Sequence, residues 1–170
     1  MFGIPLDLLL QFHVAISLVG IATGLIVLYG LLTGQSFGVW TALFLLTTII
    51  TCITGFPLPP FGFDPPRAIG ILTLVLLAIA VAALYGFRLV GGWRWIYVVT
   101  AVASLYLNVF VAIVQSFQKL PFLQPLAPTQ SEPPFLIAQA AVLVLFVVLG
   151  VVAVFKFHPE RATTAAVSSA

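Results

Sequence analysis

Five long apolar stretches alternate with short polar connections along the chain. The stretches cover residues 6–32, 37–56, 68–90, 93–117 and 135–157. A helix that rises about 1.5 Å per residue needs about twenty apolar residues to cross a hydrocarbon core of about 30 Å, and each stretch meets that length with almost no charge. The pattern therefore predicts an all-α fold, a polytopic bundle of five transmembrane helices.

The polar remainder of the chain is too small for a second domain. The sequence is 62% hydrophobic and 6% charged, whereas a soluble domain carries about 25% charged residues. We expect one transmembrane domain over residues 1–157 and a short disordered cytoplasmic tail over residues 158–170. Residues 1–32 are interpreted as a retained first span, because their apolar run exceeds the about 7–15 residues of a signal-peptide core and no basic residue precedes it.

Prolines and basic residues orient the predicted bundle. Ten of the twelve prolines fall in the second and fourth connections, namely Pro57, Pro59, Pro60, Pro65, Pro66, Pro121, Pro125, Pro128, Pro133 and Pro134. With five spans, both connections lie on the face of the N-terminus, where proline's fixed φ predicts stiff loops. That face carries Arg67 and Lys119, and the opposite face carries Arg88, Arg94, Lys156 and Arg161. The positive-inside rule therefore predicts an N-terminus outside and a C-terminus in the cytoplasm.

Polar and small residues recur within the spans at spacings of three and four, which place them on one face of each helix. Most of them lie toward the outer ends of their spans, and polar groups in a membrane usually face the bundle interior. We therefore predict an outward-facing polar pocket. Its expected ligand-binding residues are His13, Ser17, Thr51, Thr54, Asn108, Gln115, Gln118 and Gln139.

The same residue types also fit a purely structural role. Hydroxyl and amide side chains join membrane helices through hydrogen bonds worth roughly 0.6 kcal/mol each, and small residues let helices approach closely. Two rows of small residues are candidates for such close approach, Gly20 with Gly24 and Ala78 with Ala82 and Gly86. We expect His13 to be neutral and hydrogen-bonded to a hydroxyl or an amide of the polar stripes.

Few residues in the sequence suggest catalysis or metal binding. The two histidines, His13 and His158, are expected near opposite membrane faces, so one chain cannot clamp a haem between them, although His13 of two copies can. Cys52 is the only cysteine, which excludes an intrachain disulfide. No carboxylate pair and no lysine lie in the middle of a span. We therefore expect a non-enzymatic protein without metal ligands or a nucleic-acid partner, and no cofactor is assigned.

The segment before the fifth span has two interpretations. Ser131 can cap the helix while Glu132 sits at its positive end, since a hydroxyl suits an N-cap and an acid suits the first turn. Alternatively, Gln130 and Glu132 line the mouth of the pocket beside Lys119.

Five segments resemble those of small multi-pass inner-membrane proteins of bacteria. They are HVAIS at 13–17, WTALFL at 40–45, WRWIYV at 93–98, YLNVFV at 106–111 and LAPTQSEPPF at 126–135. The resemblance extends over most of the chain. It implies a bacterial cytoplasmic membrane and does not imply an activity.

Three functions fit these features. The leading hypothesis is a non-enzymatic integral membrane protein whose outward-facing pocket binds or helps to move a small or amphipathic molecule, with membrane lipid around it. The second is an accessory subunit of a larger membrane complex, respiratory or photosynthetic, or one subunit of a homo-oligomer. The third is a quinone- or haem-linked redox protein.

Overall fold

The computed structural model describes residues 5–58 and 65–158, and these form a bundle of five long helices. They are α1 (Leu6–Thr33), α2 (Gly38–Gly55), α3 (Pro65–Val81), α4 (Trp93–Lys119) and α5 (Pro133–Lys156). With the π-helical turn Ala82–Gly86 that continues α3, all five are long and apolar enough to cross a membrane. The predicted all-α bundle of five spans is confirmed. Of the expected tail, only His158 is among the described residues, and residues 159–170 lie outside them.

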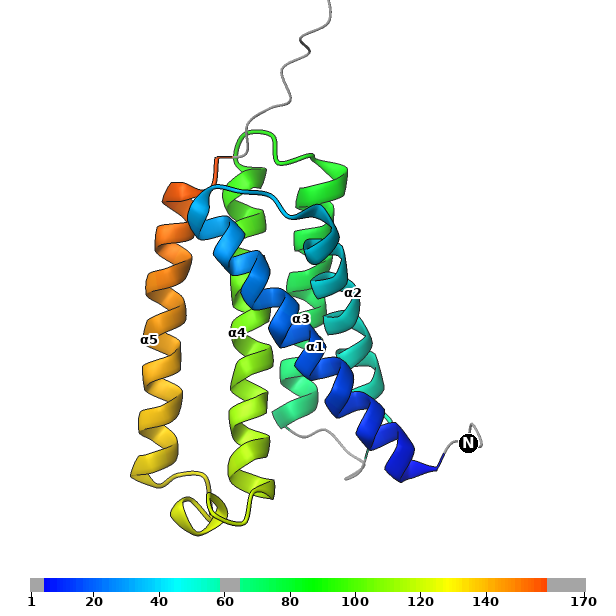
Figure 1. The fold of residues 1–170 in the computed structure, drawn as a ribbon, viewed down its shortest axis with the longest axis vertical. Helices are drawn as coiled ribbons and strands as arrows, with labels where there is room; N and C mark the ends of the chain where they lie inside the picture. The colour runs from blue at the N-terminus through cyan, green and yellow to red at the C-terminus, as the bar shows by residue number, and fades with distance from the viewer. Residues whose placement is uncertain (1–4, 59–64, 159–170) are drawn as a thin grey trace, which may run out of the picture.

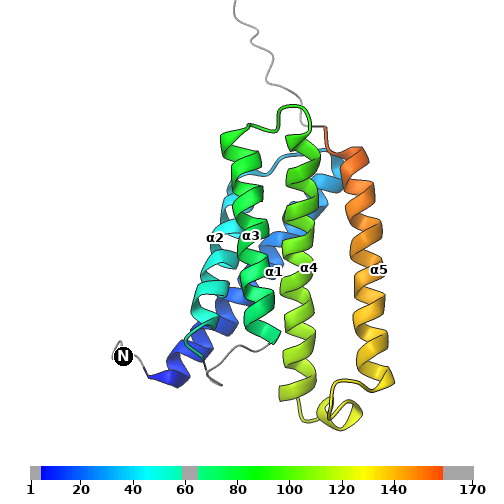
Figure 2. The same cartoon turned by 180° about the vertical axis from the view of Figure 1, so that it is seen from behind.

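The helices alternate in direction, so their connections gather at two ends of the bundle (Figure 1). The short α1–α2 and α3–α4 connections and the end of α5 share one end, which we name the inner end after the predicted orientation. The N-terminus of α1 and the α4–α5 connection share the other, the outer end. In both Figure 1 and Figure 2, α1 crosses the bundle obliquely, so its C-terminal end lies beside α5 while its N-terminal end lies far from it.

The inner half of the bundle holds a continuous apolar core. Helix α4 lies centrally there and contacts α1, α3 and α5. The buried core residues are Val27, Leu28, Leu31, Phe44, Leu45, Leu77, Ala80, Ala83, Tyr97, Val98, Ala101, Val102, Leu105, Phe146, Ala153 and Phe157. The outward faces of the helices are apolar as well, with many exposed large hydrophobic side chains. Such faces fit helices that are long and apolar enough to cross a membrane, where tight packing rather than water exclusion holds helices together.

Close helix approach occurs at one of the two rows of small residues. A Cβ on Gly24 would lie 2.5 Å from Leu105 Cδ1 and 2.9 Å from the Phe44 ring, so only glycine lets α1 come this near to α2 and α4. In the row on the third helix, Ala78 and Gly86 are exposed and no atom lies within 4 Å of a Cβ built on Gly86, whereas Ala82 is partly buried. Among the described residues, Ala78 and Gly86 are therefore not points of close helix approach.

The helix ends differ from the predicted spans in three places. Helix α3 begins at Pro65 and α5 at Pro133, so the paired prolines expected in the connections occupy first turns, where the missing N–H costs nothing. Helix α3 also ends in the π-helical turn, before the predicted limit at residue 90. The C-terminal carbonyls of α5 are satisfied across the bundle, because Arg94 donates to the Val154 oxygen at 2.9 Å and also to that of Phe157.

Candidate functional site

The neighbouring helices bury the central helix α4 to different extents along its length. Seven of the nine residues 97–105 are buried, whereas each of the eight residues 109–116 is neither buried nor fully exposed. Over residues 109–116 no face of the helix is fully buried, although Ile113 and Val114 pack against a small buried cluster of Phe117, Ala127 and Phe135. Helix α1 shows the same change, with no buried residue among residues 5–19 and seven among the residues from Gly20 to Leu31.

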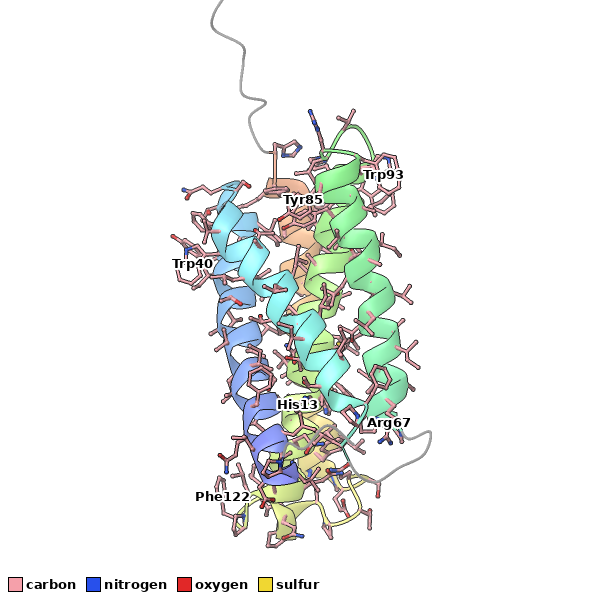
Figure 3. All side chains as sticks on the ribbon, turned by 90° about the vertical axis from the view of Figure 1, so that its right-hand side faces the viewer. His13, Trp40, Arg67, Tyr85, Trp93 and Phe122 are labelled. Carbon is pink, nitrogen blue, oxygen red and sulfur yellow. The ribbon has the colours of Figure 1, made fainter. Side chains whose placement is uncertain are left out.

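His13 lies in this outer half and contacts the end of α2. Its Nδ1 is 3.0 Å from the Thr54 hydroxyl oxygen, and a Cβ on Gly55 would lie 3.3 Å from His13 Cε1, so the glycine leaves room for the ring. Figure 3 places His13 toward the same end of the bundle as Arg67, away from Trp40, Tyr85 and Trp93. The expected hydrogen bond between His13 and a hydroxyl of the stripes is confirmed.

The Thr54 hydroxyl also lies within hydrogen-bond distance of two carbonyls of its own helix, the Ile50 oxygen at 2.8 Å and the Thr51 oxygen at 3.2 Å. When the hydroxyl donates to one of these, it accepts from His13 Nδ1 in the tautomer that carries the proton there.

A second polar group lies one to two turns deeper, where α1, α2 and α4 meet at Gly20. The Asn108 Nδ2 and Thr48 Oγ1 atoms lie 3.2 Å, and Thr47 Oγ1 3.3 Å, from the position that a Cβ on Gly20 would occupy. Thr48 is 1% exposed and Asn108 9% exposed. Within the part of the chain that the structure describes, neither the Asn108 amide nitrogen nor the Thr48 hydroxyl has a hydrogen-bond partner.

Most other hydroxyls of the spans are satisfied on their own helices, by donating to a carbonyl four residues back. These are Thr23, Thr47, Thr51, Thr54, Thr73, Thr100, Ser104 and Ser116. Such bonds form within one helix and need no contact with another helix, so these hydroxyls contribute little to which helices become neighbours. The unpartnered atoms at Gly20 are therefore exceptions that the local pattern does not explain.

The remaining predicted ligand-binding residues are spread around α4. Gln139 on α5 donates from Nε2 to the Phe110 oxygen at 3.2 Å, and its Oε1 is buried without a partner among the described residues. Ser17 donates to the Val14 oxygen at 2.8 Å on its own helix. Gln115 is partly exposed and Gln118 exposed. The structure thus joins His13 with Thr54 and brings Asn108 to α1 and α2, while Gln139 belongs to the α4–α5 contact.

Sequence reasoning overlooked Thr48. It is three positions before Thr51 and so shares its face, which is the signal that could have found it. Gln130, one of the two residues expected at the pocket mouth in the alternative interpretation, has a left-handed backbone with φ 60° and donates from Nε2 to the Val114 oxygen at 3.1 Å. This bond holds the α4–α5 connection against α4, and nothing in the spacing of the sequence indicates it.

The turn before α5 is organised by Glu132 rather than by Ser131. The helix begins at Pro133 with Glu132 as N-cap, so the expected Ser131 cap is wrong. The Glu132 carboxylate instead accepts hydrogen bonds from the Thr129 hydroxyl at 2.8 Å and from the backbone N–H groups of Thr129 and Ser131, both at 3.1 Å. Desolvation raises the pKa of Glu132, but these hydrogen bonds outweigh it and hold the pKa below its ordinary value.

In the part of the chain that the structure describes, no three or more His, Cys, Asp and Glu side chains gather where they could hold an ion. Comparisons with protein-family models, with curated proteins and with solved structures gave no match to this chain.

Proposed function

We propose that this protein is a non-enzymatic integral membrane protein whose outer half receives a small or amphipathic molecule, which it binds or helps to move. The observation that carries the proposal is the contrast along α4, where residues 109–116 are all partly exposed above a tightly buried stretch at 97–105. A loosely surrounded segment above a sealed one is the arrangement that a pocket open to one side requires. The unpartnered polar atoms near Gly20 lie where the loose half ends.

Thiol labelling tests this proposal directly. Cys52 is the only cysteine, so a Cys52→Ala background accepts single cysteines at chosen depths. We expect Val111→Cys and Gln115→Cys to react with a membrane-impermeant, water-soluble thiol reagent added from outside. Two controls should stay unreactive, Val102→Cys in the core at 6% exposed and Val144→Cys on the lipid-facing side of α5 at 62% exposed.

The outcome of this labelling shows whether water or lipid surrounds residues 109–116, and whether the site is a pocket or a channel. If Val111→Cys and Gln115→Cys stay as unreactive as Val144→Cys, lipid rather than water surrounds residues 109–116, and the proposal fails. If Val102→Cys reacts as well, the site is a channel through the bundle rather than a pocket closed on the inner side.

The proposal includes an orientation in a bacterial inner membrane, with the N-terminus outside and the C-terminus in the cytoplasm. Its support is the distribution of four basic residues at the inner end against two at the outer end. A reporter fused after Ala170 should be cytoplasmic, and a tag inserted at residues 124–131 should be accessible from outside. The opposite labelling would reverse the orientation and make the open half face the cytoplasm.

One observation favours the accessory-subunit alternative. Among the described residues, Ala78 and Gly86 of the third helix are exposed and no atom lies within 4 Å of a Cβ on Gly86, although rows of small residues commonly serve helix association in membranes. Ala78→Leu should weaken assembly with a partner subunit or a second copy while leaving the thiol labelling of the outer half unchanged. Size-exclusion chromatography in mild detergent measures this change.

A further inference from the structure

We propose that the ligand presents an uncharged oxygen group, a hydroxyl or a carbonyl, to Asn108 and Thr48 at the point where α1, α2 and α4 meet. This inference rests on the proposed function, since it names the chemistry of the molecule that the outer half receives. Two buried side chains, 1% and 9% exposed, converge on this point with unpartnered polar atoms.

The point where the polar atoms of Asn108 and Thr48 meet lies at the depth where a pocket open to the outer side would end. The polar atoms of Asn108, Thr48 and Thr47 all lie within 3.3 Å of the position of a Cβ on Gly20. One turn farther in, a Cβ on Gly24 would lie 2.5 Å from Leu105 Cδ1, which shows that the helices are in full contact there. On the outer side, α1 has no buried residue among residues 5–19. A polar group that entered from the outer side would meet Asn108 first, and closely packed helices stop it one turn farther in.

The hydrogen-bonding groups of Asn108, Thr48 and Thr47 favour a ligand that presents an oxygen atom. The Asn108 Nδ2 atom can only donate, and the Thr48 hydroxyl can donate or accept. The Thr47 hydroxyl already donates to the Leu43 oxygen at 2.7 Å, so it offers only lone pairs. An oxygen of the ligand accepts from Asn108 and Thr48, and a hydroxyl additionally donates to a threonine oxygen. A buried donor left without an acceptor costs stability, which a bound oxygen restores.

The absence of charge on the surrounding helices excludes an ionic group. The sequence has no Asp, Glu, Lys or Arg between Asp7 and Asp64 or between Arg94 and Lys119. Helices α1, α2 and α4 therefore bring no counter-ion to the depth of Asn108, and an unpaired charge within a membrane protein is costly. The apolar remainder of the ligand fits the partly exposed aliphatic side chains of α4, such as Val111 and Val114.

Photolabelling in lipid nanodiscs tests this chemistry. The probe is a fatty alcohol with a diazirine in its chain, and mass spectrometry maps the labelled peptides. We expect labelling of the outer-half peptides of α1, α2 and α4. Excess decanol or 2-undecanone should compete, whereas decyl sulfate and decyltrimethylammonium, with the same chain length and permanent charges, should not.

Two threonines supply a matched pair of variants. Thr48→Val removes an unpartnered hydroxyl, and Thr73→Val removes an equally buried hydroxyl that donates to Ile69 on its own helix at 2.8 Å. Thr48→Val should weaken competition by decanol about threefold without lowering the thermal midpoint, and Asn108→Leu should weaken it about tenfold, the loss expected for a missing hydrogen bond to a buried donor. Thr73→Val should leave the competition unchanged.

The possible negative results distinguish a failure of the uncharged-oxygen site from a failure of the proposed function. Equal competition by either charged compound, or wild-type competition in both Thr48→Val and Asn108→Leu, would overturn the uncharged-oxygen site while a pocket of other chemistry stands. A fall of the thermal midpoint in Thr48→Val without a change in competition would assign the hydroxyl to helix packing and likewise overturn the site. No labelling of the outer half by any probe, together with unreactive Val111→Cys, would remove the proposed function itself.

Discussion

The inner half of the bundle buries the central helix α4 almost completely, whereas the outer half buries it only in part. In the inner half, residues 97–105 of α4 are almost all buried and Gly24 allows α1 to lie directly on Leu105 and Phe44. In the outer half, α1 leans away from α5 (Figure 1), and residues 109–116 of α4 are covered only in part. The oblique path of α1 permits both, because a helix that crosses its neighbours at an angle packs closely only near the crossing.

Polar side chains follow the same division. Ser104 in the inner half is fully buried and satisfied on its own helix, whereas Asn108, one turn farther out, is buried with an unpartnered amide nitrogen. A membrane protein that only needed to hold its helices together would gain more from an apolar residue at position 108. The comparison therefore separates a half whose buried hydroxyls are satisfied from a half in which the buried Asn108 amide nitrogen has no partner among the described residues, and the proposed binding site would account for that cost in stability.

The largest test of this comparison uses one substitution at two depths of the same helix. Val98→Ala removes fully buried methyl groups in the inner half and should lower the free energy of unfolding by about 2 kcal/mol, because their packing contacts are lost and a cavity remains. Val111→Ala, at a partly exposed position, should cost less than about 1 kcal/mol. Unfolding titrations in mixed micelles measure both. Equal losses would mean that the two halves are packed alike.

A smaller effect is expected from adding a methyl group where the helices touch. Gly24→Ala should destabilise the bundle by about 1–2 kcal/mol, because the Phe44 ring must move from a position only 2.9 Å from the new Cβ. Gly70→Ala is the control, since no atom lies within 4 Å of a Cβ there and alanine favours a helix. Its stability should equal or exceed that of the parent protein. A neutral Gly24→Ala would show that α1 can shift without loss.

The hydrogen bond between His13 and Thr54 should contribute less to the free energy of unfolding than the helix contact at Gly24. A double-mutant cycle with His13→Gln and Thr54→Val should give a coupling energy of about 0.5–1 kcal/mol, the range for hydrogen bonds between membrane helices. Thermal unfolding of the four proteins measures the coupling. A coupling of zero would place the imidazole among headgroups or water instead of against α2, and would remove His13 from the site.

The smallest effect concerns the turn at Glu132. Because the folded pKa of this carboxyl is lowered below its reference value of 4.5, its hydrogen bonds stabilise the turn fully above that value, and the contribution is lost as the pH falls through the lower folded pKa. Limited proteolysis within residues 124–132 should therefore accelerate in acid. Glu132→Gln should cleave faster than the parent at neutral pH and should respond less to acid. Identical acid responses would exclude Glu132 as the cause.

The hydrogen bond of His13 to a hydroxyl could be predicted from the sequence, but the position of Asn108 relative to it could not, because Asn108 lies one to two turns deeper, at Gly20. Thr47 and Thr48 illustrate the reason. The two are adjacent and both buried, yet one donates back along its helix while the other meets Gly20 unpartnered. The rotation of α2 about its axis decides between them, and no repeat in the sequence specifies that rotation to one residue.

The number of spans, their alternating direction, and the polar and small stripes follow from the sequence alone, because hydropathy and helical period depend only on residues near one another in the chain. Three features follow only from how the helices pack: the oblique path of α1, the exposed positions of Ala78 and Gly86, and the amide nitrogen of Asn108, which has no partner among the described residues. These features depend on the tilt and rotation of whole helices. Contacts between residues far apart in the chain, such as Gly24 with Phe44 and Leu105, set both.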